Sequence, residues 1–220
     1  MPVPPPPPVA SNVFGPRLVQ IQIYAELLAG AGVERGLIGP AETQRLWDRH
    51  LLNSAVVAEL IPMSQELTGT GNFELADLGS GAGLPGVVLA ILLPDIRVVL
   101  VEPMLRRATF LQECIGALGL GNVEVRRARA EDLAGEIRAD VVTARAVASL
   151  DRLAALASGL ARPGGLVLAI KGGTAAAELE RAGPVLRQLG VTGAEIVTAG
   201  SGLVGQPATV IRFRTKRADR

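Results

Sequence analysis

The sequence predicts an α/β protein with a doubly wound, seven-stranded and mostly parallel sheet that follows an N-terminal helical extension. From residue 73 onward, apolar runs typical of buried strands alternate with stretches of helical spacing, and repeated strand–helix units form parallel sheets. The last two expected strands follow one another without a helix between them, which indicates a hairpin and one reversed strand. A turn with three alternating glycines follows the first strand, where such sheets bind ligands.

The residues before the sheet divide into a proline-rich tail and two helices. The proline run at 4–8 predicts an extended, disordered start to the chain. Apolar residues at helical spacing then predict helices over 16–31 and 41–60. The expected division is, in order, a tail over 1–12, a helical extension over 13–69 and a sheet domain over 70–217.

The sheet domain is expected to alternate strands and helices up to the final hairpin. The expected strands cover 73–78, 97–101, 123–126, 140–143, 166–170, 194–198 and 209–214. The expected helices cover 85–93, 104–118, 150–160 and 175–189.

Composition excludes several classes of protein. A single cysteine, Cys114, rules out an internal disulfide framework and fits a reducing compartment. The longest strongly apolar run, Val87 to Leu93, is too short to span a bilayer, and the N-terminus lacks the pattern of a signal peptide. The formal net charge of +1 neither indicates nor excludes a nucleic-acid partner. We expect a soluble, cytoplasmic protein without a metal site.

The glycine-rich turn has two interpretations. The spacing Asp77-x-Gly79-x-Gly81-x-Gly83 is typical of S-adenosylmethionine sites, whereas Gly81-x-Gly83-x-x-Gly86 matches the dinucleotide fingerprint. Glu102 ends the next strand, where a carboxylate accepts hydrogen bonds from the ribose hydroxyls of an adenosine group. The motif therefore predicts a nucleoside site without deciding which nucleoside.

Asp77 and the end of the sheet favour S-adenosylmethionine. An acidic residue beside the loop suits a cationic sulfonium better than a diphosphate, which binds a bare helix N-terminus. Asp77 has a second interpretation, in which its carboxylate binds the loop backbone. A seven-stranded sheet with one reversed strand also suits a methyltransferase better than a dinucleotide half-domain. Two alternatives stay open, a methyltransferase acting on a small molecule and a nicotinamide-dependent oxidoreductase.

Beyond the turn, the chain resembles the RsmG (GidB) family, which methylates guanine N7 in the decoding region of 16S ribosomal RNA. The residues that carry the resemblance are Arg49-His50-Leu51-Leu52-Asn53-Ser54, the turn from Asp77 to Gly86, Glu102-Pro103 with Arg107, Ala144-Arg145-Ala146-Val147-Ala148-Ser149-Leu150, and Ile170-Lys171-Gly172. These blocks run in order from about residue 17 to 215, and the proline-rich start is not among them.

The resemblance implies a Rossmann-like class I methyltransferase that uses S-adenosylmethionine on one guanine, at position 527 of that RNA. It places the ribose on Glu102, where relatives often carry aspartate. With the glycine motif, the expected cofactor residues are Gly79, Gly81, Gly83, Leu84, Glu102, Ala130, Glu131 and Arg145. The implied partner is 16S ribosomal RNA within a small-subunit particle, with no membrane and no metal.

The chemistry of this reaction needs few catalytic groups. Guanine N7 has an available in-plane lone pair and no proton to remove, so catalysis can rest on positioning. We therefore assign no certain catalytic residue and treat Arg145 as the candidate. His50, the single histidine, is expected to be a structural residue beside the pocket. Basic residues at successive strand ends predict a positive rim for an RNA backbone, with the expected contacts Arg107, Arg129, Arg145 and Lys171.

Overall fold

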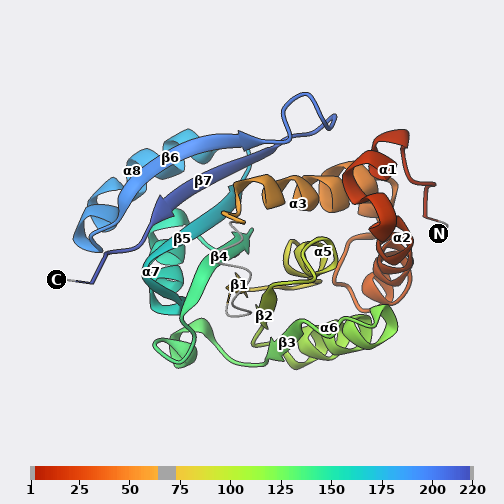
Figure 1. Ribbon diagram of the computed structural model, residues 1–220, viewed down its shortest axis with the longest axis horizontal. Helices are drawn as coiled ribbons and strands as arrows, with labels where there is room; N and C mark the ends of the chain where they lie inside the picture. The colour runs from red at the N-terminus through yellow and green to blue at the C-terminus, as the bar shows by residue number, and fades with distance from the viewer. Residues whose placement is uncertain (1–2, 64–72, 219–220) are drawn as a thin grey trace.

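A seven-stranded sheet forms the centre of the molecule, with the strand order β3-β2-β1-β4-β5-β7-β6 (Figure 1). The computed structural model describes residues 3–63 and 73–218. Its strands are β1 (Glu74–Leu78), β2 (Arg97–Val101), β3 (Val123–Arg126), β4 (Ala139–Arg145), β5 (Ala161–Lys171), β6 (Thr192–Ala199) and β7 (Ala208–Arg214). The first five strands pair in parallel, and β7 is antiparallel to both β5 and β6. The predicted fold, including the single reversed strand, is confirmed.

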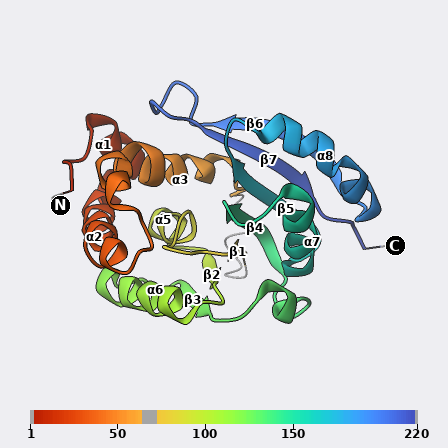
Figure 2. The ribbon, with the colours of Figure 1, turned by 180° about the vertical axis from the view of Figure 1, so that it is seen from behind.

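Helices cover both faces of the sheet, which is why its central strands are apolar without alternation. The helices that follow the strands are α5 (Gly86–Leu92), α6 (Leu105–Leu118), α7 (Leu150–Leu160) and α8 (Ala175–Gln188). Residues of α5 and α6 belong to one hydrophobic core, and residues of α7 and α8 belong to a second core on the opposite side. Figure 2, seen from behind, shows the same two layers on either side of the sheet.

The helical extension packs on the layer formed by α5 and α6. It contains α1 (Pro8–Phe14), α2 (Leu18–Leu27) and α3 (Asn53–Ala55). Segments of 3₁₀ and π geometry continue these helices at η1 (Gly15–Arg17), η2 (Leu28–Gly32), η3 (Pro40–Arg45), η4 (Leu46–Leu52) and η5 (Val56–Leu60). Side chains from the extension, α5 and α6 form one continuous core, so the extension is part of the same packed unit.

Residues 8–12 differ from the disordered tail expected over residues 1–12, of which residues 1 and 2 lie outside the described part of the chain. Helix α1 begins at Pro8. Proline suits this position because a backbone nitrogen in the first turn of a helix has no acceptor within the helix, so the missing N–H costs nothing. Ala10 and Phe14 are buried, and the Trp47 Nε1–H donates to the Pro4 carbonyl at 2.8 Å. Pro7 keeps an extended backbone, with φ −66° and ψ 156°, so the helix begins at the last residue of the proline run and buries apolar surface beyond it. The expected boundary at 69/70 lies outside the described residues.

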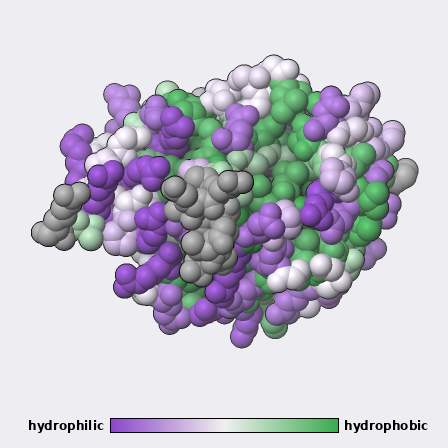
Figure 3. Space-filling view, in the orientation of Figure 1, coloured by the Kyte–Doolittle hydropathy of each residue, from purple (hydrophilic) through white to green (hydrophobic). Residues whose placement is uncertain are grey.

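The remaining element bounds agree with the sequence to within a few residues, except at β5. This strand begins at Ala161 rather than at 166, because Ala161 pairs with Ala139 before the pairing shifts register. Within the two described ranges, no helix is both long and apolar enough to cross a membrane. Figure 3 shows hydrophilic and hydrophobic side chains interspersed over the face that it presents.

Candidate active site

A cavity lies at the carboxyl ends of β1, β2 and β4, where the strand order changes direction. Strand β1 has β2 on one side and β4 on the other, and the topological switch point of such a sheet is where ligands bind. The cavity has a volume of about 650 Å³. Its lining comprises Leu78, Gly79, Val101, Glu102, Pro103, Met104, Arg107, Arg129, Ala130, Glu131, Ala146, Val147, Ala148, Arg152 and Leu156. We call it the β1–β2 cavity.

Glu102 is a buried carboxylate at the wall of the β1–β2 cavity. Its Oε2 accepts a hydrogen bond from the Gly81 backbone N–H, and its Oε1 accepts one from the Met104 N–H, both at 2.9 Å. The Arg107 Nη1 lies 3.7 Å from Oε2. Each carboxylate oxygen can accept more than one hydrogen bond, so these contacts fix the side chain and leave acceptor capacity toward the cavity.

The three glycines of the turn have different surroundings. All three have positive φ, at +67° for Gly79, +59° for Gly81 and +96° for Gly83. Gly79 lies in the β1–β2 cavity wall, while Gly83 is packed inside the protein. A Cβ on Gly83 would lie 2.5 Å from the Val87 Cγ2 and 2.6 Å from the Tyr24 hydroxyl. Gly83 therefore shapes the turn from behind and does not itself line the β1–β2 cavity.

Asp77 binds the loop backbone, one of the two roles considered for it. Its side chain is buried, and Oδ1 accepts a hydrogen bond from the Thr143 hydroxyl at 2.8 Å. Oδ2 accepts the N–H of Gly86, the first residue of α5, at 3.2 Å. Burial raises the pKa of the Asp77 carboxyl to about 6 despite these hydrogen bonds. The buried Asp77 side chain thus accepts the first backbone N–H of α5.

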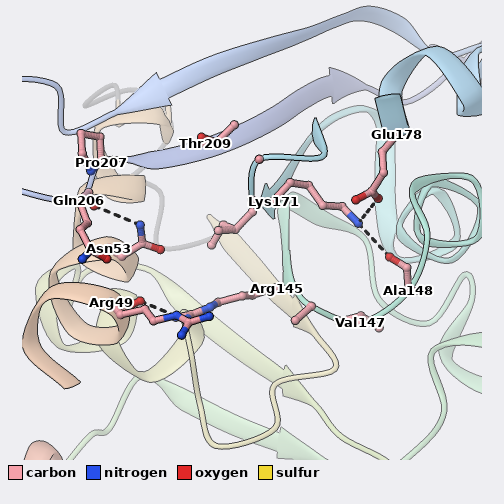
Figure 4. Close-up of a pocket in the computed structure, with 14 residues that line it drawn as sticks. Arg49, Asn53, Arg145, Val147, Ala148, Lys171, Glu178, Gln206, Pro207 and Thr209 are labelled. Atoms are coloured by element: carbon pink, nitrogen blue, oxygen red, sulfur yellow. Dashed lines mark hydrogen bonds and ion pairs between the residues drawn. The ribbon is translucent and has the colours of Figure 1, made fainter. Parts of the chain in front are cut away.

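A short loop separates the β1–β2 cavity from a second cavity of about 630 Å³. Figure 4 shows the residues that line this second cavity. We call residues 146–148 the partition loop, because all three line both cavities. The second cavity, called here the β4–β5 cavity, lies at the ends of those strands and below the β6–β7 connection. Its other lining residues are Arg49, Asn53, Arg145, Ile170, Lys171, Gly172, Gly173, Glu178, Gln206, Pro207 and Thr209.

Arg145, the last residue of β4, is held by the helical extension. Its guanidinium donates to the Arg49 carbonyl at 3.1 Å and to the His50 Nδ1 at 2.8 Å (Figure 4 shows the bond to Arg49). Because arginine only donates, His50 Nδ1 accepts, and its Nε2–H donates to Glu42 Oε2 at 2.8 Å. Burial, followed by the charge of Arg145, lowers the pKa of His50. The imidazole is therefore neutral and orients Arg145, a structural role beside the pocket.

The other expected cofactor residues divide between two cavities. Ala130 and Glu131 begin η6 (Ala130–Leu133) and line the β1–β2 cavity. Gly81 and Leu84 line a third cavity of about 390 Å³, which also includes His50, Arg145 and Gly79. Gly79 lines both cavities, so the turn forms their common wall.

The expected RNA contacts lie in two groups. Arg107 and Arg129 line the β1–β2 cavity with Glu102, while Arg145 and Lys171 line the β4–β5 cavity. Lys171 is mostly buried, and its ammonium donates to the Ala148 carbonyl and lies 2.8 Å from the Glu178 carboxylate.

Sequence reasoning did not single out several residues that build the site. Val147, Glu178 and Gln206 come from a loop, a helix and the β6–β7 connection, and each reaches the site only through the tertiary fold. Val147 could have been found from the family resemblance, because it lies inside the matching block from Ala144 to Leu150. Glu178 follows Lys171 by seven residues across a turn, a spacing that carries no motif.

Comparisons with known proteins agree on one family. The family model described as rRNA small subunit methyltransferase G matches residues 17–202. A Mycolicibacterium gilvum (strain PYR-GCK) protein named Ribosomal RNA small subunit methyltransferase G is 50% identical over 212 residues, which are 95% of this chain and 89% of the relative. A protein of the same name from Thermobifida fusca (strain YX) is 52% identical over 209 residues, covering 95% of this chain and 85% of the relative.

Solved structures show a likeness of fold. A SAM-dependent O-methyltransferase from Thermotoga maritima aligns with a TM-score of 0.54 and 16% identity, over 77% of this chain and 66% of that chain. TYW2 from M. jannaschii, solved in complex with AdoMet, aligns with a TM-score of 0.52 and 19% identity, over 72% of this chain and 79% of that chain.

Proposed function

Since the chain belongs to the rRNA small subunit methyltransferase G family, we propose that it transfers a methyl group from S-adenosylmethionine to N7 of a guanine in the decoding region of 16S ribosomal RNA. The observation that carries this proposal is the buried Glu102 carboxylate at the wall of the β1–β2 cavity. The enzyme is an S-adenosylmethionine-dependent methyltransferase, and the cofactor supplies the reactive methyl group when bound.

The β1–β2 cavity fits the cofactor in size and chemistry. A volume of about 650 Å³ lies within the range of sites that bind small molecules. Glu102 offers acceptors for the donor hydroxyls of a ribose, and Leu78, Val101 and Leu156 offer apolar surface for an adenine ring. The proposed cofactor residues are Gly79, Gly81, Leu84, Glu102, Ala130, Glu131 and Arg145, with Gly83 shaping the turn.

The N-terminus of α5 argues against a nicotinamide dinucleotide. A diphosphate bound in that way needs free backbone N–H groups at the start of the helix. Here the Gly86 N–H donates to the buried Asp77 carboxylate, and a Cβ on Gly86 would lie 2.4 Å from Leu100. The last glycine of the dinucleotide pattern is therefore a packing residue, and a diphosphate would face an acidic side chain.

The residues around the cavities position groups and do not need to remove a proton. Guanine N7 carries an in-plane lone pair and no proton, so no general base is required. Arg145 is a guanidinium, which cannot accept a proton, and His50 is already bonded through both ring nitrogens. The proposed role of Arg145 is to hold substrate groups where the two cavities approach one another.

Cations at successive strand ends distinguish RNA from a small-molecule substrate. Arg107, Arg129 and Arg145 surround the two cavities, and Arg49 adds a fourth guanidinium from the extension. A charged backbone would meet this rim, whereas a small methyl acceptor would not need it. We further propose that the substrate is RNA folded within a small-subunit particle, in the cytoplasm. Aromatic residues that could stack on bases are few, at 3% of the chain. Recognition of the RNA would therefore rest on its phosphate backbone and its shape.

The test is methylation of small ribosomal subunits that lack the modification, with radiolabelled S-adenosylmethionine. We expect label in 16S RNA, and strand scission at one guanine after borohydride and aniline treatment, which cleaves at N7-methylguanine. Label without scission would refute N7 as the acceptor, and no label in ribosomal RNA would refute the proposed substrate. Protein-free 16S RNA is compared in parallel, and equal labelling would refute the preference for a particle.

A further inference from the structure

Lys171 binds the last residue of the partition loop, Ala148. This lysine ends β5, and its side chain is only 7% exposed. Its Nζ donates to the Ala148 carbonyl at 2.8 Å and lies 2.8 Å from Glu178 Oε2. Figure 4 shows the ammonium pointing toward Ala148 and Glu178, in the opposite direction from the Arg145 guanidinium. The ammonium is therefore directed into the protein.

Glu178 is held in place to receive this ammonium. It lies in the first turn of α8, and the Thr174 hydroxyl donates to its Oε1 at 3.0 Å. The hydrogen bond from Lys171 lowers the pKa of the Glu178 carboxyl, so this carboxyl is ionised at neutral pH. Removing one partner of a largely buried ion pair leaves the other charge without compensation.

The partition loop is a segment whose conformation needs support. Ala146 has a φ of +54°, a left-handed conformation that residues with a side chain adopt at a cost. The next residue, Val147, packs against the glycine turn, because a Cβ on Gly79 would lie 2.8 Å from its Cγ2. A chain of contacts thus runs from Glu178 through Lys171 and the loop to the wall of the β1–β2 cavity.

We propose that Lys171 and Glu178 are positioning residues, which act together as a latch that sets the partition loop and, through Val147, the shape of the cofactor site. The proposal rests on the proposed function, since it takes the β1–β2 cavity as the cofactor site. It assigns Lys171 a role through the protein backbone and replaces the expected contact with an RNA phosphate. An ammonium has three donors, and two of them are directed to Ala148 and Glu178.

The two roles of Lys171 predict opposite results when Glu178 is removed. Glu178→Ala leaves the lysine in place but frees its ammonium from the carboxylate. If Lys171 contacts a phosphate, this change adds an available positive charge and tightens binding of ribosomal RNA, with cofactor binding unchanged. If Lys171 latches the loop, the change loosens the loop and weakens cofactor binding even when no RNA is present.

The experiment measures the Kd and stoichiometry of S-adenosylhomocysteine by calorimetry with the full chain and no RNA. We expect Kd to rise about tenfold in Lys171→Met and about threefold in Glu178→Ala, as loss of a charge-assisted hydrogen bond would give. Glu180→Ala is the matched control, because Glu180 is exposed on the same helix and its loss changes the net charge equally. Its Kd is expected to equal that of the wild type.

Stoichiometry separates a latch from a general loss of folding. Irreversibly unfolded protein lowers the number of sites but leaves the Kd of the folded fraction unchanged. A reversibly unfolded fraction would raise the apparent Kd, so each variant is assayed well below its melting temperature, where that fraction is negligible. Lys171→Arg, which can still donate to both partners, is expected to recover most of the affinity. An unchanged Kd in Lys171→Met refutes the latch, and so does tighter RNA binding by Glu178→Ala at unchanged Kd. If Lys171→Met does not fold, Glu178→Ala decides alone. Wild-type protein that binds S-adenosylhomocysteine but does not methylate ribosomal RNA would refute the proposed function and leave this test intact.

Discussion

Gly83 is the position in the glycine turn where a single methyl group is expected to be most damaging. It has a φ of +96°, and an added Cβ would lie 2.5 Å from the Val87 Cγ2, 2.6 Å from the Tyr24 hydroxyl and 3.1 Å from a methyl of Leu111. These neighbours are themselves buried, so they have little room to move. Gly83→Ala therefore combines backbone strain with overpacking.

The expected size of the effect follows from these two contributions. A left-handed conformation costs a residue with a side chain about 1–2 kcal/mol. Overpacking of a well-filled core costs typically about 1–3 kcal/mol. The sum lowers the free energy of unfolding by about 2–5 kcal/mol, which for a chain of 220 residues corresponds to a fall in Tm of roughly 10 °C.

Gly81→Ala is the control that isolates the backbone contribution. Gly81 has a φ of +59°, but the nearest atom to its added Cβ is the Gly79 carbonyl oxygen at 3.8 Å, an ordinary contact. We expect a loss of only about 1–2 kcal/mol, measured by urea unfolding followed by circular dichroism. Gly116→Ala, inside α6 with no atom within 4 Å of the added Cβ, is expected to stabilise by about 0.5–1 kcal/mol. Equal losses for Gly83→Ala and Gly81→Ala would refute the packing argument.

Three further predictions concern buried polar groups around the turn. Tyr24→Phe removes the hydrogen bond from the Tyr24 hydroxyl to the Ala82 carbonyl at 2.6 Å, and is expected to lower the free energy of unfolding by about 1 kcal/mol in urea titrations; no change would contradict a stabilising role. Burial raises the pKa of Asp77 to about 6 from 3.8, so the folded state binds this proton more tightly than the unfolded state does. The stability of the wild type, as far as Asp77 determines it, therefore falls by about 3 kcal/mol as the pH rises from about 4 to above 6. Asp77→Asn is expected to lose this dependence, and parallel stability–pH curves for the two proteins would show that Asp77 does not titrate in this way. Glu102→Gln is expected to raise the Kd of S-adenosylhomocysteine about tenfold in calorimetry, and an unchanged Kd would remove Glu102 from the cofactor site.

The fold could be predicted from the sequence because its local signals agree with its global topology. The strands are continuous apolar runs, since helices cover both faces, and the two final strands lack a helix between them. The helix from Pro8 to Phe14 was not predicted, because it depends on the burial of Ala10 and Phe14, which is a tertiary effect. Only the folded structure shows that Trp47 binds the Pro4 carbonyl.

The candidate site was predictable where its residues follow strands directly. Gly79, Glu102 and Arg145 stand at the carboxyl ends of β1, β2 and β4, and parallel pairing brings these ends together. The direction in which a side chain points was not predictable. Lys171 stands at the expected edge, yet its ammonium turns inward to Glu178, a partner on the following helix that no spacing rule identifies.

The partition loop also limits how such an enzyme can change over evolutionary time. Its three residues are the shared wall of two cavities, so a substitution that reshapes one cavity reshapes the other. A substitution in this loop that reshapes the β4–β5 cavity would also change the β1–β2 cavity, which is proposed to bind the cofactor. The β4–β5 cavity should therefore change more readily through the extension or the β6–β7 connection, each of which lines this cavity without lining the β1–β2 cavity. The extension and the β6–β7 connection can therefore diverge independently of the β1–β2 cavity, whereas the partition loop cannot.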